Sequence, residues 1–208
     1  MQSNAGRPRA PGRGPRLRAA VFAATLAELA ERGYANLTID NVARRTGVHK
    51  TSLYRHWPDR QRLVLEALTA NVASGMPIPD TGQIETDLRA YARSLVGWLT
   101  SPVGQAILAA TLSDAARVPE IGALERGFYD DRLRRAEPIV SRAIARGELP
   151  PDTDAAEVVK TMIAPIYLRL LITAEPIDAT TADRAAQLAL VAARAGILSH
   201  ASSGHVST

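Results

Sequence analysis

The chain has 208 residues, of which 46% are hydrophobic, and it carries a net charge of +4 and no cysteine. This composition allows a folded core, and the lack of cysteine excludes disulfides, thiolate metal sites and cysteine nucleophiles. The sequence shows no signal-peptide core and no run near the roughly 20 apolar residues of a membrane-spanning helix, so we expect a soluble, cytoplasmic protein without a membrane partner.

The first third of the chain is basic. Residues 1–62 contain 12 Arg and Lys against 4 Asp and Glu, whereas residues 63–208 contain 13 against 17. This asymmetry predicts that the N-terminal end meets a polyanion. Residues 1–15 are rich in Pro, Gly and Arg, which predicts a flexible basic arm.

Four helices are predicted after this arm. Apolar residues recur on one helical face from Arg16 until Gly33, a residue type that favours the left-handed end of a helix. Thr38 is a good N-cap for a short second helix, which Gly47 ends. A third helix follows directly and ends near Trp57, and Asp59 opens a fourth.

The remainder of the chain shows only helical periodicity. Residues 74–83 form a linker by composition, since they are rich in Gly and Pro. Five further helices are predicted, at residues 84–99, 102–116, 120–146, 154–173 and 182–198. No period-two alternation flanked by hairpin turns occurs, so the chain is predicted to be all-α with about nine helices.

The second and third helices, joined by a tight turn at Gly47, form a predicted helix-turn-helix unit. Periodicity divides the third helix into two faces. The apolar face comprises Val48, Leu53 and Trp57. The opposite face carries basic and hydrogen-bonding groups, namely Lys50, Thr51, Tyr54 and Arg55. Such a face can contact phosphates, base edges and thymine methyls, so we interpret it as a recognition helix for the DNA major groove. The alternative is a solvated basic helix with a half-buried Tyr.

A known family matches this region. Residues 33–68, GYANLTIDNVARRTGVHKTSLYRHWPDRQRLVLEAL, resemble the N-terminal domain of the TetR family of bacterial transcriptional regulators, and the resemblance extends over residues 16–70. Two positions depart from the family pattern, because His49 replaces the usual Ser and Asn41 stands at an often acidic position. Residues 146–154 and 162–171 more weakly resemble one type of C-terminal domain in this family.

The resemblance implies a role for each matching residue. Contacts to phosphates are expected from Thr38, Arg45, Tyr54, His56 and Arg60. Candidates for contacts to base edges are His49, Lys50, Thr51 and Arg55. A packing role is the alternative for His56, since neutral imidazole needs only one good partner.

The resemblance also implies a two-part organisation. We expect an N-terminal three-helix helix-turn-helix domain at residues 16–62, a larger C-terminal helical bundle at residues 63–200, and a tail at residues 201–208. The C-terminal bundle is expected to bind a small-molecule effector and to form a homodimer through its last two helices. The candidate interface residues are Leu188, Ala189, Val191 and Ala192, although alanine-rich helices also occur in ordinary cores.

Candidate effector-binding residues lie on helices that would surround an internal cavity. They are Tyr91, Trp98, Leu112, Phe128, Met162, Ile166 and Tyr167. Pro165 removes a backbone hydrogen bond within its helix, so a kink there would open space beside Tyr167. For each residue alone, plain core packing is the alternative.

The sequence bears on three classes of function. An enzyme is disfavoured because the histidines lie in the predicted recognition unit and the C-terminal tail, leaving no clustered metal ligands and no placed nucleophile and base. We therefore expect no cofactor and no metal. The sequence favours a DNA-binding transcriptional regulator, a repressor released from its double-stranded operator by a ligand. The alternative is an effector-independent DNA-binding protein with a structural or cell-division role.

Overall fold

The computed structural model describes residues 13–115 and 120–200. In these ranges the regular structure is nine α-helices and one π-helical turn, with no strand, which confirms the predicted all-α fold. The elements are α1 (Arg13–Asn36), α2 (Ile39–Thr46), α3 (Lys50–His56), α4 (Arg60–Gly75), α5 (Ile84–Thr100), α6 (Pro102–Ala115), α7 (Glu120–Ala145), α8 (Ala155–Tyr167), η1 (Leu168–Ile172) and α9 (Ala179–Arg194). None of these helices combines the length and apolar character needed to cross a lipid bilayer.

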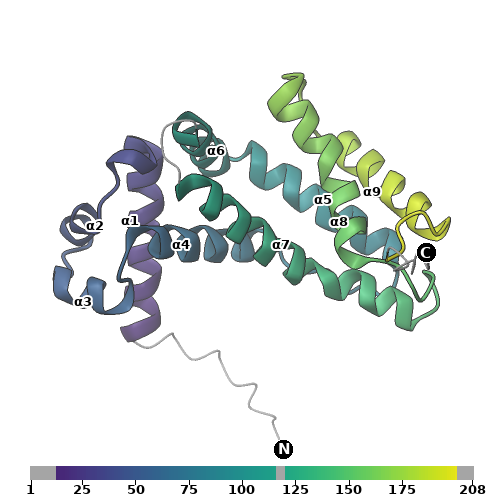
Figure 1. Cartoon of the computed structure of the whole chain (residues 1–208), viewed down its shortest axis with the longest axis horizontal. Helices are drawn as coiled ribbons and strands as arrows, with labels where there is room; N and C mark the ends of the chain where they lie inside the picture. Colours follow the sequence, from purple (N-terminus) through teal and green to yellow (C-terminus); the bar gives the residue numbers. More distant parts are fainter. Residues whose placement is uncertain (1–12, 116–119, 201–208) are drawn as a thin grey trace, which may run out of the picture.

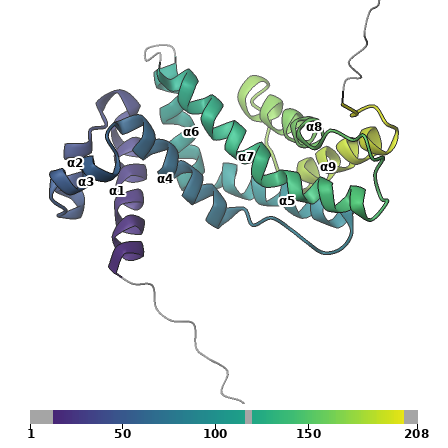
Figure 2. The same ribbon diagram turned by 60° about the horizontal axis from the view of Figure 1, so that its bottom comes forward.

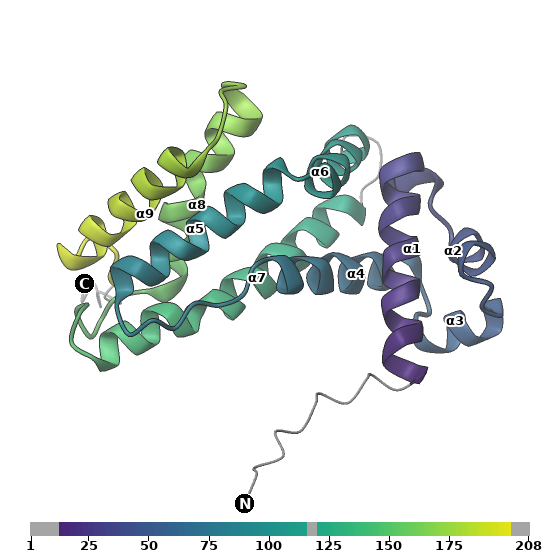
Figure 3. The same ribbon diagram turned by 180° about the vertical axis from the view of Figure 1, so that it is seen from behind.

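The helices form two groups joined by α4. Helices α1, α2 and α3 lie at one end of the molecule, and α5, α8 and α9 lie at the other (Figure 1). Helix α4 runs from α1 toward the long helix α7, which extends into the second group, and this arrangement is also visible from behind (Figure 3). Helix α6 packs against α1, so α6 is a second helix, beside α4, that contacts the first group (Figure 2).

Each group has its own hydrophobic core, and α4 contributes to both. Leu63 and Leu68 are buried with α1, α2 and α3, whereas Val72 is buried with α5, α7, α8 and α9. The predicted domain limit at residue 63 therefore falls inside a continuous helix, because the first turns of α4 complete the N-terminal core. A continuous helix therefore connects the two cores at this point.

Local side-chain contacts set the starts of the short N-terminal helices. The Thr38 hydroxyl accepts a hydrogen bond from the Asn41 amide at 3.1 Å, and the Asp59 carboxylate accepts one from the Arg62 amide at 2.8 Å. Each side chain satisfies an amide that has no partner within its helix. Gly47 ends α2 with a φ of 70°, a conformation that costs glycine little.

Three predicted helix limits need correction. Helix α1 begins at Arg13, inside the predicted arm, because Pro15 in the first turn has no amide hydrogen bond to lose. The rest of the arm and the tail at residues 201–208 lie outside the described residues. Helix α9 begins at Ala179 because Asp178 and Thr181 form a capping box, and it ends before Gly196, which has a φ of 71°.

The predicted helix at residues 154–173 is divided. Regular α-helix ends at Tyr167 and continues as the π-helical turn η1, closed by a hydrogen bond from the Thr173 amide to the Leu168 carbonyl at 3.0 Å. Pro165 cannot donate to the preceding turn, and its ring crowds the carbonyl there. The helix widens directly after this residue, which changes the direction of the apolar side chains that follow.

Candidate nucleic-acid interface

The packing of α3 fixes which of its side chains point outward. Leu53 and Trp57 are buried, with exposed fractions of 2% and 6%. The Trp57 ring meets Phe22 of α1 edge to face at 5.7 Å, and its Nε1 donates to Glu66 of α4 at 3.0 Å. Since these contacts hold one face of α3 against α1 and α4, the opposite face is presented to solvent.

The exposed face of α3 contains the side chains predicted to contact DNA. Exposed residues on or beside this helix are His49, Lys50, Thr51, Tyr54, Arg55 and His56. Tyr54 is 46% exposed, so its hydroxyl and ring are free to meet another molecule. The structure thus leaves all of the predicted base-contacting residues exposed on or beside α3, and their contact with DNA stays a prediction.

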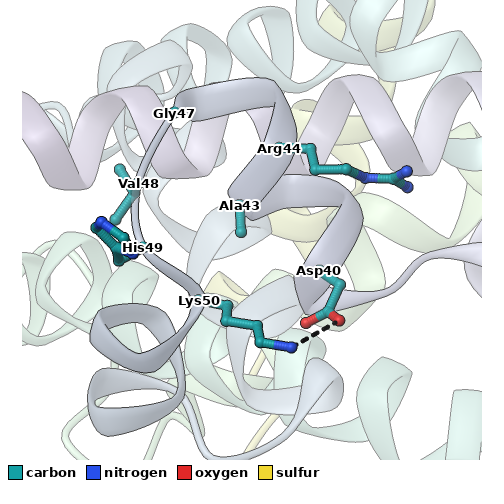
Figure 4. A pocket seen from close by; sticks show the side chains of 7 residues that line it. All are labelled: Asp40, Ala43, Arg44, Gly47, Val48, His49 and Lys50. Carbon is teal, nitrogen blue, oxygen red and sulfur yellow. Dashed lines mark ion pairs between the residues drawn. The ribbon is translucent and has the colours of Figure 1, made fainter.

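A hollow lies between α2 and α3, on the side where the two helices meet at the Gly47 turn (Figure 4). Lys50 and Asp40 face each other across it, with Nζ and Oδ2 3.8 Å apart. Arg44 also lines it and points toward solvent. Arg44 is not among the predicted site residues, although a basic residue on α2 close to the Gly47 turn is well placed to contact DNA.

Arg45 and Arg60, two of the residues predicted to contact phosphates, form hydrogen bonds within the protein. The Arg45 guanidinium donates to Glu28 at 3.0 Å and to Glu31 at 2.8 Å, both on α1. The Glu31 hydrogen bond is the main reason that the pKa of Arg45 is raised, and the same bond lowers the pKa of Glu31. Arg60 donates to the Ala35 carbonyl at 3.1 Å. Tertiary contacts thus give both arginines a structural role that the sequence could not indicate.

Thr38 occupies a position compatible with both of its possible roles. Its hydroxyl oxygen caps α2, yet the side chain is exposed at the start of this helix. The hydroxyl hydrogen can still be donated, because capping uses only the oxygen as acceptor. A phosphate at this helix start would also benefit from the helix dipole.

We expect Arg45→Ala to lower the melting temperature, because the buried Glu28 and the exposed Glu31 lose a shared partner. The slope of log affinity for DNA against log salt should stay unchanged, since Arg45 holds no phosphate in this interpretation. Arg44→Ala is the matched control, with a flatter slope by about one unit and an unchanged melting temperature. The reverse pattern, measured by thermal denaturation and DNA titration at several salt concentrations, would contradict this assignment.

The predicted effector-binding residues lie in and around the C-terminal core. Tyr91, Met162 and Ile166 are fully buried there. Trp98 and Phe128 are half-buried and pack against both cores. The remaining two candidates are Tyr167, half-buried at the end of α8, and Leu112 of α6, whose side chain lies outside the described part of the chain. Effector binding by these residues remains a prediction.

Trp98 links this region to α4. Its Nε1 donates to the Asn71 side chain at 2.9 Å, and the ring approaches Gly75 closely enough that a Cβ there would lie 3.4 Å from it. A displacement of Trp98 would therefore also displace α4, whose first turns are part of the N-terminal core.

Arg132 is a buried residue that is not among the predicted site residues. Only 4% of this α7 residue is exposed, and its Nη1 donates to the Tyr167 hydroxyl at 3.0 Å. Its Nη2 has no hydrogen-bond partner among the described residues. The surrounding sequence, DDRLRR, is typical of a solvated helix face, so nothing in the sequence indicated burial.

The predicted dimer residues divide between surface and core. Leu188 and Val191 of α9 are each 55% exposed, and Leu168 and Ile172 of η1 add further exposed apolar groups at 53% and 75%. We call Leu188 and Val191, which lie three positions apart on α9, the apolar patch. Ala189 was placed wrongly at the surface, because its position on α9 turns it into the chain's own core, where it is completely buried. Ala192 is half-buried.

The part of the chain that the structure describes contains no group of three His, Cys, Asp or Glu side chains placed to hold a metal ion. Acidic side chains near the candidate interface pair with basic ones instead, as Asp40 does with Lys50 and Glu66 with Arg18. The Arg18–Glu66 pair joins α1 to α4.

Comparisons with known proteins place both halves of the chain. Residues 21–67 match the family model of bacterial regulatory proteins of the TetR family, and residues 78–189 match that of tetracyclin repressor-like C-terminal domains. The chain is 39% identical to the HTH-type transcriptional regulator AqdR of Rhodococcus erythropolis, over 74% of each protein. It is 34% identical to the DNA-binding transcriptional repressor TetR of Mycobacteroides abscessus, over 68% of this chain and 75% of that one.

A solved structure agrees with these relatives. The crystal structure of the TetR family transcription regulator SCO0332 superposes with a TM-score of 0.70 at 30% sequence identity, covering 85% of this chain and 97% of that one. Both family models, the relatives and this structural neighbour are consistent with the exposed basic face of α3 and the two-core helical architecture. The chain therefore belongs to the TetR family of DNA-binding, helix-turn-helix transcriptional regulators.

Proposed function

We propose that this protein is a homodimeric repressor of the bacterial cytoplasm that leaves its operator when a small molecule binds in the C-terminal domain. The observation that carries the proposal is the exposed face of α3, where Lys50, Tyr54 and Arg55 point away from the core. A repressor named among the relatives supports the direction of regulation.

Recognition would place α3 in the major groove. His49, Lys50, Thr51 and Arg55 would meet base edges there, while Tyr54, His56 and Thr38 would hold flanking phosphates. The pair of Lys50 with Asp40 presents little obstacle, because an exposed ion pair contributes only about 0–1 kcal/mol.

Dimerisation would use the apolar patch on α9. Leu188 and Val191 are exposed three positions apart on α9, and neighbouring exposed apolar side chains are costly to leave in water. A two-fold dimer would present two copies of α3, which suits a partly palindromic operator with half-sites roughly 34 Å apart.

Effector control would act through α4. This helix contributes to both cores, and the Trp98–Asn71 hydrogen bond joins it to α5. An effector that binds one arrangement of α4 better than another would shift the spacing of the two α3 helices, and only such differential affinity can release DNA. A coupling of about 1–3 kcal/mol corresponds to about a 5–150-fold loss of operator affinity.

The experiment that tests DNA recognition is selection of bound sequences from a random duplex pool with the full-length protein. We expect a partly palindromic motif to be enriched, and binding to it to exceed binding to scrambled DNA at physiological salt. Enrichment of no sequence, with equal affinity for all duplexes, would contradict a specific operator. It would favour a structural DNA-binding role instead.

A further inference from the structure

Arg132 places a positive charge inside the C-terminal domain, and no described side chain supplies it with an acidic partner. Arginine is always charged in proteins and is almost never fully buried unless it is paired. Other arginines of this chain do find carboxylates, as Arg93 does with Asp183 at 2.7 Å. Among the residues whose side chains the structure describes, the partners of Arg132 are tyrosines, and none is a carboxylate.

The acidic residue next to Arg132 in sequence is committed elsewhere. Asp131 is paired with Arg135 at 2.6 Å and with Arg134 at 3.3 Å, on the outer side of α7. The groups that approach the Arg132 guanidinium are neutral hydroxyls. Tyr167 accepts from its Nη1, and Tyr91 is close enough to interact with its charge. Hydroxyls satisfy hydrogen bonds but do not balance a charge, and Nη2 has no hydrogen-bond partner among the side chains that the structure describes.

The tyrosine that accepts from this guanidinium belongs to a row of aromatic rings. Tyr129 lies edge to face with Phe128 at 5.7 Å and with Tyr167 at 5.9 Å, so three rings form a continuous wall between α7 and α8. The site lies where α5, α7 and α8 come together, in the group distant from α3 (Figure 1). Offset and edge-to-face contacts with such rings favour a flat, apolar ligand body.

We infer that the Arg132 guanidinium binds the carboxylate of an aromatic organic acid, and this inference rests on the proposed effector control. A guanidinium presents paired N–H groups that match the two oxygens of a carboxylate. One carboxylate carries one negative charge and balances Arg132, whereas a phosphate dianion would leave a negative charge among neutral tyrosines. Tyr167 then acts as a positioning residue that orients Nη1.

The test uses the full-length protein with benzoate, phenylacetate, cinnamate and naphthoate, each beside its neutral primary amide. We expect at least one acid to raise the melting temperature and to weaken binding to the selected operator, while its amide does neither. In Arg132→Met the dissociation constant for that acid should rise about 10–150-fold, the loss of a hydrogen bond to a charged group. Arg135→Met, which removes an exposed arginine from the same helix, should bind the acid as wild type does.

The outcomes separate this inference from the proposed function. Release of DNA by the amides as well as the acids would leave effector control standing and would overturn the role of Arg132. Unchanged acid binding by Arg132→Met would do the same. If none of the acids stabilises the wild type, the aromatic carboxylate assignment is wrong. Operator binding is measured without ligand, so this result would leave the DNA-binding proposal standing.

A measurement without ligand distinguishes binding from a purely structural role. Removing an unpaired buried charge while keeping side-chain volume should leave the melting temperature of Arg132→Met equal to or above that of wild type. A loss as large as that of the core truncation Met162→Ala would assign Arg132 to structure and overturn the inference. If Arg132→Met does not fold, Arg132→Lys is used instead, because it keeps the positive charge but loses the paired N–H donors of the guanidinium. This variant is expected to bind the acid more weakly than the wild type.

Discussion

Replacing Lys50 and Tyr54 together with alanine is expected to abolish most specific DNA binding while leaving the fold and the dimer intact. Both side chains are exposed on α3, and the burial of Leu53 and Trp57 does not depend on them. A side chain that contacts a base contributes about 1–3 kcal/mol, which is about 5–150-fold in affinity. Loss of Lys50 also leaves the carboxylate of Asp40 uncompensated beside the DNA, which adds repulsion.

Fluorescence anisotropy with the selected operator, at several salt concentrations, measures this effect. The slope of log affinity against log salt should flatten by about one unit for each lost phosphate contact. Lys160→Ala is the control, because it removes the same charge from α8, in the other half of the molecule. Wild-type affinity of the double variant, with an unchanged circular dichroism spectrum, would show that the outward face of α3 does not read DNA.

A charge introduced into the apolar patch is expected to convert the protein into a monomer. Leu188 is largely exposed in the isolated chain, so Leu188→Asp should leave the fold of the protomer undisturbed. In a two-fold dimer the substitution occurs on both sides of the interface. A buried charge without a partner costs about 3–5 kcal/mol, which raises the dimer dissociation constant by at least about 100-fold.

Light scattering during size-exclusion chromatography at micromolar concentration checks this prediction, and operator binding is measured in parallel. The monomer should lose most operator affinity, because it engages one half-site only. Val103→Asp provides the matched control, since Val103 is a 47% exposed apolar residue of α6 outside the patch. A Leu188→Asp variant that remains dimeric, or a wild type that is already monomeric, would place the interface elsewhere or exclude it.

Local chemistry in the sequence determined the helix-turn-helix unit. Thr38 and Asp59 are capping residues whose side chains reach only three residues along the chain, and Gly47 is needed for its own backbone angle. Such signals do not depend on the rest of the fold. Periodicity also separated the buried Leu53 from the exposed Tyr54, because α3 packs on one side only.

Tertiary structure decided the features that depend on residues distant in sequence. Arg45 is tied to Glu28, 17 positions away, and Arg132 meets Tyr167, 35 positions away. Helical periodicity shows which residues share a face, but it does not show which neighbour covers that face. Ala189 was misplaced for this reason, because α9 is covered by α5 and α8 on the side that contains it. The charge of Arg132 favours an exposed side chain when only the sequence is considered. The packing of α5 and α8 against α7 shows that it is buried.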